Sequence, residues 1–97
     1  MRIFSWNING MRAAVRKGFL EWLHTEAPDV ICLQEIKATP NDLIKEMAEP
    51  EGYHAVWNPA QRKGYSGVAI LSKKKPKKIH LGMGIKRFDV EGRIIRL

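Results

Sequence analysis

The chain has 97 residues, a length that fits one small domain, and its 17 Lys and Arg against 10 Asp and Glu give a formal net charge of +7. This excess favours a polyanionic partner such as nucleic acid. Because Cys32 is the single cysteine, an internal disulfide is excluded. We expect Cys32 to be buried. An unpaired thiol also suits the reducing cytoplasm, so we expect a cytoplasmic protein. The sequence has neither a secretory signal nor an apolar run of membrane-spanning length, so no membrane partner is expected.

The first half of the chain predicts a strand, a helix and a second strand. Residues 2–8 (RIFSWNI) are rich in β-branched and aromatic residues, as strands are. Apolar residues recur at helical spacing over 19–27, with Gly18 separating a first turn from the main helix and Pro28 closing it. The apolar run at 30–33, which follows Asp29, is typical of a strand covered on both faces. This order predicts parallel neighbouring strands joined by a right-handed crossover.

Two polar residues stand where these strands end. Asn7 closes the first strand and Glu35 follows the second. In neighbouring parallel strands they start only about 5 Å apart, at the edge where α/β sheets bind ligands. Taken singly, Asn7 fits a turn better, and Glu35 fits a surface residue and a metal ligand equally well. Together, an amide and a carboxylate at one edge favour a site for a hard cation such as Mg²⁺.

The second half of the chain predicts mainly strands. A turn at 39–42 begins a second helix, and strands are expected at 53–58, 68–71 and 79–81. Their short connections predict antiparallel neighbours, so the sheet should be mixed. A further strand is expected at 93–97, where the sequence stops without a turn or cap, which favours a truncated chain.

Four segments resemble the exonuclease III-like AP endonucleases of the endonuclease/exonuclease/phosphatase superfamily. In chain order they are 5–13 (SWNINGMRA), 28–37 (PDVICLQEIK), 64–72 (GYSGVAILS) and 88–95 (FDVEGRII), and they cover essentially the whole chain. The resemblance implies an α/β fold, the amino-terminal part of a four-layer α/β sandwich, with a mixed β-sheet and helices on one face. Residues 1–97 would form an incomplete amino-terminal portion of that domain. The family's later Gly-Asp-Leu-Asn and Ser-Asp-His motifs are absent, as is a tyrosine from a middle loop.

The resemblance also implies a function. It implies hydrolysis of the DNA phosphodiester backbone at abasic sites, with 3′–5′ exonuclease activity, dependent on Mg²⁺ or Mn²⁺. The partner would be double-stranded DNA with abasic sites or 3′ ends. Glu35 and Asn7 match the metal-site and catalytic residues, whereas Arg12 and Tyr65 match positions against the DNA backbone. Because further catalytic residues are missing, the fragment is expected to be inactive alone.

Several residues keep alternative interpretations. Lys37 could pair with Glu35, which we favour, or bind the DNA backbone. Asn9 stands where some relatives carry an aspartate near the metal, and its amide would make that contribution neutral. The lysine-rich run at 73–78 fits a solvated hairpin tip better than a nucleic-acid contact. Ser66 and Gly67 are expected to serve a turn and a close backbone approach. The tryptophans are expected in the core; they are Trp6, Trp22 and Trp57.

Two other classes of function remain open on the sequence. One is another metal-dependent phosphoesterase of the same superfamily, acting on RNA ends, inositol phosphates or lipid head groups. The other is a non-catalytic module that binds nucleic acid by charge alone, with affinity falling steeply as salt rises.

Overall fold

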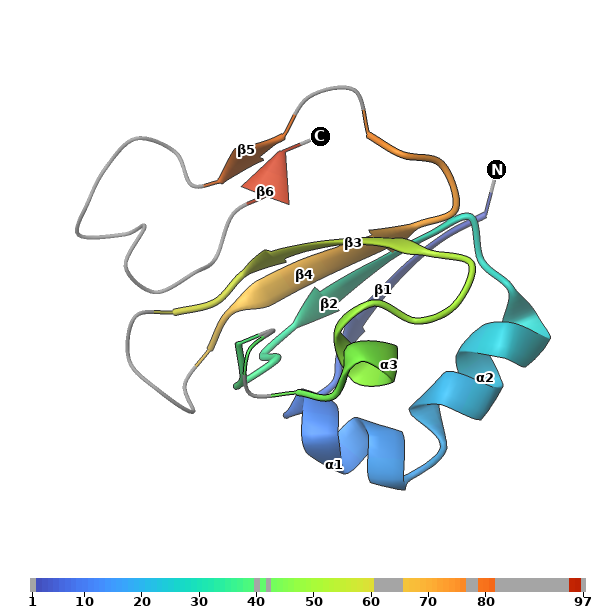
Figure 1. Cartoon of the computed structure of the whole chain (residues 1–97), viewed down its shortest axis with the longest axis horizontal. Coiled ribbons are helices and arrows are strands. Elements are labelled where there is room, and N and C mark those ends of the chain that lie inside the picture. Colours follow the sequence, from blue (N-terminus) through green and yellow to red (C-terminus); the bar gives the residue numbers. More distant parts are fainter. Residues whose placement is uncertain are drawn as a thin grey trace.

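The computed structural model describes residues 2–39, 41, 43–60, 66–76, 79–81 and 95–96. Within this part of the chain the secondary structure follows the order expected for a mixed α/β fold (Figure 1). The elements are β1 (Ile3–Asn7), α1 (Met11–Arg16), α2 (Phe19–Glu26), β2 (Val30–Gln34), α3 (Lys45–Ala48), β3 (His54–Asn58), β4 (Val68–Ser72), β5 (His80–Leu81) and β6 (Ile95–Arg96).

The main sheet is mixed, as predicted, with strand order β1-β2-β4-β3. The strand expected at 79–81 does not join it, however, because β5 pairs with β6 in a separate two-stranded sheet. β1 and β2 are parallel neighbours, with Asn7 opposite Gln34. β4 lies antiparallel to both β2 and β3, and Ser72 pairs with Val30 on one side and His54 on the other. We call the edge where β1 and β2 end the carboxyl edge, and the edge where they begin the amino edge. The predicted strand–helix–strand unit is therefore confirmed, and it sends Asn7 and Glu35 to the carboxyl edge.

The helices lie on one side of the main sheet, and the β5–β6 pair lies on the other (Figure 1). Gly18, at φ +98°, separates α1 from α2, as the sequence predicted. The second predicted helix is shorter than expected, because α3 covers only Lys45–Ala48. Ile44 before it is extended, at φ −68° and ψ 158°, so the first helical turn begins later than the turn at 39–42 suggested.

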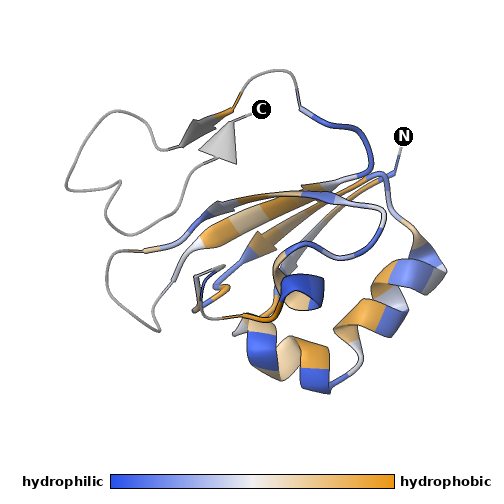
Figure 2. Ribbon diagram, in the orientation of Figure 1, coloured by the Kyte–Doolittle hydropathy of each residue, from blue (hydrophilic) through white to orange (hydrophobic). Residues whose placement is uncertain are grey.

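The core fills the space between the sheet and the helices. The residues of β2 and β4 that face the helices are fully buried, and apolar side chains from α1 and α2 meet them. Figure 2 shows β2 and β4 as largely apolar, whereas apolar and polar residues alternate along α1 and α2. The main contributors are Ile31, Leu33, Ala69, Leu71, Met11, Phe19 and Leu23. Burial of this one face holds the helices against the sheet.

The opposite face of β2 is only half covered, which corrects the expectation of a strand buried on both faces. Val30, Cys32 and Gln34 alternate with the buried residues and are each half-buried. The prediction that Cys32 is buried was therefore wrong. Its partial burial still raises the pKa of the thiol, because the thiolate is desolvated there.

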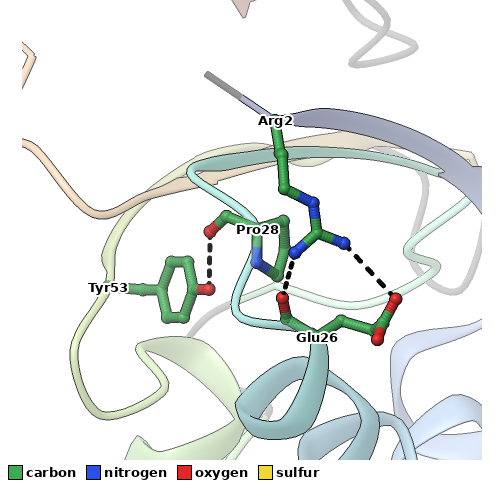
Figure 3. Close-up of polar contacts among 4 residues, drawn as sticks. All are labelled: Arg2, Glu26, Pro28 and Tyr53. Carbon is green, nitrogen blue, oxygen red and sulfur yellow. Dashed lines mark hydrogen bonds and ion pairs between the residues drawn. The ribbon is translucent and has the colours of Figure 1, made fainter.

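Contacts at the amino edge fix the connection from α2 to β2 (Figure 3). The Arg2 guanidinium donates to the Glu26 carbonyl at 2.6 Å and lies 3.4 Å from the Glu26 carboxylate. The buried Tyr53 hydroxyl donates to the Pro28 carbonyl at 2.7 Å. Asp29 accepts a hydrogen bond from the Arg2 backbone N–H at 2.7 Å, and this bond lowers the pKa of the carboxyl. Among the described residues, no helix has the length and apolarity that crossing a membrane requires.

Candidate metal centre

Asn7 and Glu35 meet at the carboxyl edge. Asn7 is the last residue of β1, Glu35 follows β2 directly, and the amide nitrogen Nδ2 of Asn7 donates to Oε2 of Glu35. The Glu35 side chain keeps 43% of its surface exposed, so a ligand can reach it. The predicted proximity of these two residues is confirmed, whereas their role in binding a metal stays a prediction.

The orientation of the Asn7 amide is set by its second partner. The backbone N–H of Asn9 lies 3.1 Å from Oδ1 of Asn7. A backbone N–H can only donate, so the atom facing it must be the amide oxygen. The nitrogen of Asn7 therefore faces Glu35 and holds one carboxylate oxygen. In this arrangement Asn7 orients Glu35, and its own oxygen points to the backbone of Asn9.

The backbone beyond β2 leaves the extended conformation at once. Glu35 and Lys37 have φ values of +52° and +54°, in the left-handed region that residues other than glycine seldom adopt. Backbone hydrogen bonds hold this conformation from one side. Gly10 N–H donates to the Glu35 carbonyl at 2.7 Å, and Met11 N–H donates to the Ile36 carbonyl at 2.8 Å. The start of α1 is thereby joined to the residues that follow β2.

The segment before β4 holds the same backbone from the other side. Ile36 N–H donates to the Gly67 carbonyl at 3.2 Å, and Lys37 N–H donates to the Ser66 carbonyl at 2.8 Å. Gly67 has φ +88°, and a Cβ there would stand 2.8 Å from Cγ1 of Ile36. The close backbone approach predicted for Ser66 and Gly67 is confirmed. Ile36 itself is fully buried, so it anchors the exposed Glu35 to the core.

Lys37 pairs with Glu35, as the sequence analysis favoured. Its ammonium lies 3.9 Å from Oε1 of Glu35 and donates a hydrogen bond to Oδ1 of Asn9. The contact with Asn9 was not predicted, because sequence spacing does not reveal which acceptor a long, flexible side chain reaches. Four polar side chains thus form one connected group, which we call the edge cluster; it consists of Asn7, Asn9, Glu35 and Lys37.

Of the two residues expected to contact the DNA backbone, Arg12 and Tyr65, the structure describes only Arg12. Arg12 is exposed in the first turn of α1, two residues beyond Gly10, whose N–H binds the Glu35 carbonyl. This places its backbone next to the edge cluster. Tyr65 lies outside the described residues, so its predicted role stays a prediction.

An aromatic groove of about 460 Å³ adjoins the edge cluster through Asn9. Trp6, Phe19 and Trp22 line it, together with Lys17. Trp6 keeps 40% of its surface exposed, which corrects the prediction that it is a core residue. Its position on β1, the first strand in the order β1-β2-β4-β3, explains the exposure, because no other strand among the described residues pairs with that side of β1. Trp22 and Trp57 pack against the core, as predicted.

The donors of the edge cluster fit a Mg²⁺ ion that is only partly held by protein. Mg²⁺ keeps several waters and takes one or two carboxylates together with substrate phosphates. Glu35 supplies one exposed carboxylate, held in place by Asn7. Within the described part of the chain, no three acidic, His or Cys residues gather into a fuller set of ligands.

Comparison with known proteins shows that the chain is similar to part of several nucleases. It is 46% identical over 98 residues to the exodeoxyribonuclease of Bacillus subtilis, covering 100% of this chain and 38% of that protein. It is 44% identical over 97 residues to a DNA-(apurinic or apyrimidinic site) endonuclease of Dictyostelium discoideum, covering 100% of this chain and 27% of that protein. The chain thus spans well under half the length of these relatives.

A solved structure of a related protein has the same fold over almost the whole length of this chain. The AP endonuclease from Archaeoglobus fulgidus superposes with a TM-score of 0.81 at 30% identity, covering 99% of this chain and 36% of that one. The α/β fold implied by the sequence resemblance is thereby confirmed. The Endonuclease/Exonuclease/phosphatase family matches residues 4–97. The chain therefore belongs to the endonuclease/exonuclease/phosphatase family.

Proposed function

We propose that this chain supplies part of the active site of a Mg²⁺-dependent DNA repair nuclease. The enzyme would hydrolyse the phosphodiester backbone at abasic sites and remove nucleotides from 3′ ends. The observation that carries the proposal is the contact between Asn7 and Glu35 at the carboxyl edge. The names of the relatives from Bacillus subtilis and Dictyostelium discoideum, an exodeoxyribonuclease and an AP-site endonuclease, support the choice of substrate.

Each residue of the site has a task that follows from its contacts. A bound Mg²⁺ would neutralise charge on the phosphate and so favour attack at phosphorus. Glu35 would hold that ion through its exposed carboxylate, and Asn7 would fix the carboxylate's orientation. Arg12 would dock the DNA backbone by bidentate hydrogen bonds to phosphate, a geometry that a guanidinium favours.

We propose that the 97-residue chain alone binds DNA but does not cleave it. Hydrolysis also needs a group that activates water and a group that protonates the leaving oxygen. The edge cluster offers one carboxylate, one ammonium and two amides, and the amides cannot move protons at neutral pH. The remaining groups would come from parts of the enzyme outside these 97 residues.

A chimera tests the proposal directly. The 97 residues would replace the matching stretch of the Bacillus subtilis exodeoxyribonuclease, to which they align over their whole length. We expect the chimera to cleave a duplex with one abasic site when Mg²⁺ is present, and the chain alone to leave it intact. The measurement is product formation on a denaturing gel, with chelator as the control.

Other outcomes would favour other interpretations. Chelator-sensitive cleavage by the pure 97-residue chain would contradict the incomplete site. A folded chimera that ignores abasic DNA but cleaves another phosphodiester would favour a different branch of the family. Binding to DNA that is indifferent to Mg²⁺ and to the lesion, without cleavage by the chimera, would favour a binding module.

A further inference from the structure

The ammonium of Lys37 stands beside the part of Glu35 that a metal ion would use. Oε2 of Glu35 accepts the Asn7 amide, and Oε1 lies 3.9 Å from Nζ of Lys37. Lys37 also donates to Oδ1 of Asn9, which is a neutral acceptor. The positive charge of Lys37 is therefore balanced within the edge cluster by Glu35 alone.

This ion pair is weak enough to be exchanged. The side chains of Lys37 and Glu35 are 38% and 43% exposed, and 3.9 Å is at the outer limit of an ion pair. Exposed pairs of this kind change an equilibrium by at most about five-fold, because water screens the two charges. A divalent cation carries twice the charge of an ammonium and can approach the carboxylate more closely, so it can compete for Oε1.

We propose that Lys37 is an exchangeable counter-ion of Glu35, an inference that rests on the metal role proposed above for Glu35. Without a cation, the ammonium neutralises the carboxylate and holds it beside Asn7. When a divalent cation binds Glu35, the ammonium and the cation repel each other, and the hydrogen bond to Asn9 retains Lys37 at the edge. There the ammonium is free to bind a DNA phosphate. Lys37 thus pairs with the Glu35 carboxylate before the cation binds and with a DNA phosphate afterwards.

The first test measures cation affinity. Lys37→Met removes the competing charge, so we expect Mn²⁺ to bind about two- to five-fold more tightly, as followed by the loss of the free-ion EPR signal. Lys37→Arg keeps the charge and should bind Mn²⁺ as the wild type does. Lys73→Met is the matched control, because Lys73 follows β4 at the amino edge, about 16 Å away along a five-residue strand. It should leave the affinity unchanged.

The second test measures DNA binding by the same variants. Fluorescence anisotropy with an abasic-site duplex, at several salt concentrations, gives the slope of log affinity against log salt. With Mg²⁺, Lys37→Met should lower that slope by about 0.9, the loss of one phosphate contact. With chelator instead of Mg²⁺, the slope should match the wild type. Lys73→Met should give the same difference from the wild type in both conditions.

The outcomes distinguish the counter-ion role of Lys37 from the metal role of Glu35 on which it rests. If the folded wild-type chain binds no Mn²⁺, the metal role of Glu35 fails, and this inference fails with it. If the wild type binds Mn²⁺ and Lys37→Met binds it equally well, only the counter-ion role is overturned. An equal loss of salt slope with Mg²⁺ and with chelator would make Lys37 an ordinary phosphate contact and would also overturn the exchange.

Discussion

Glu35→Gln is expected to weaken Mn²⁺ binding by the chain about ten-fold or more, because it removes the one carboxylate of the edge cluster. Glutamine keeps the shape of the side chain, and its carbonyl oxygen can still accept the Asn7 amide. The loss should therefore come from charge and not from misfolding. An EPR titration of free Mn²⁺ at low ionic strength measures it, with circular dichroism confirming the fold.

Glu51→Gln is the matched control for that measurement. Glu51 is exposed in the turn before β3, and β3 begins at the amino edge, where His54 pairs with Ser72. Its substitution removes the same charge at the amino edge, far from the edge cluster, so the Mn²⁺ affinity should not change. If Glu35→Gln and Glu51→Gln lowered the affinity equally, Mn²⁺ would be responding to net charge, and Glu35 would lose its role as a ligand.

Ile36→Ala is expected to lower the free energy of unfolding by about 2–5 kcal/mol, the usual cost of truncating a fully buried aliphatic side chain to alanine. Ile36 contributes to the core, and its Cγ1 packs so closely on Gly67 that a Cβ there would stand only 2.8 Å away. The truncation leaves a cavity between β2 and the segment before β4. Urea denaturation followed by circular dichroism gives the change in stability.

Ile44→Ala separates burial from residue type. Ile44 precedes α3 and is 60% exposed, so the same truncation should change stability by no more than about 0.5 kcal/mol. Ile36 lies between Glu35 and Lys37, so its loss should also weaken Mn²⁺ binding in the folded variant. Equal stability losses for Ile36→Ala and Ile44→Ala would contradict the view that the site is anchored through Ile36.

The sequence predicted the sheet well because its strands carry clear local signals. The apolar run ending at Leu33 and the segment ending at Asn7 flank a helix, and that order leaves few topologies other than parallel neighbours. The proximity of Asn7 to Glu35 follows from the same rule. Gly67 was also interpreted correctly, since a glycine before a buried strand marks a close approach of two backbones.

Features that depend on contacts between distant segments could not be predicted from the sequence. Nothing local requires Glu35 or Lys37 to adopt a left-handed conformation; hydrogen bonds to Gly10 and Ser66 impose it. The link between Lys37 and Asn9 depends on the same turn. The exposure of Trp6 depends on its position in the outermost strand, which alternation within one strand does not reveal.

The location of the bound ion tests the central claim most directly. In ¹H–¹⁵N NMR spectra of the labelled 97-residue chain, substoichiometric Mn²⁺ broadens the nuclei nearest to it. The side-chain amide of Asn7 and the backbone amides of Glu35 and Lys37 should broaden first, while those of Val30 and Ser72 at the amino edge stay sharp. Broadening centred on the amino edge, or spread evenly over the chain, would contradict a cation site built by the ends of β1 and β2.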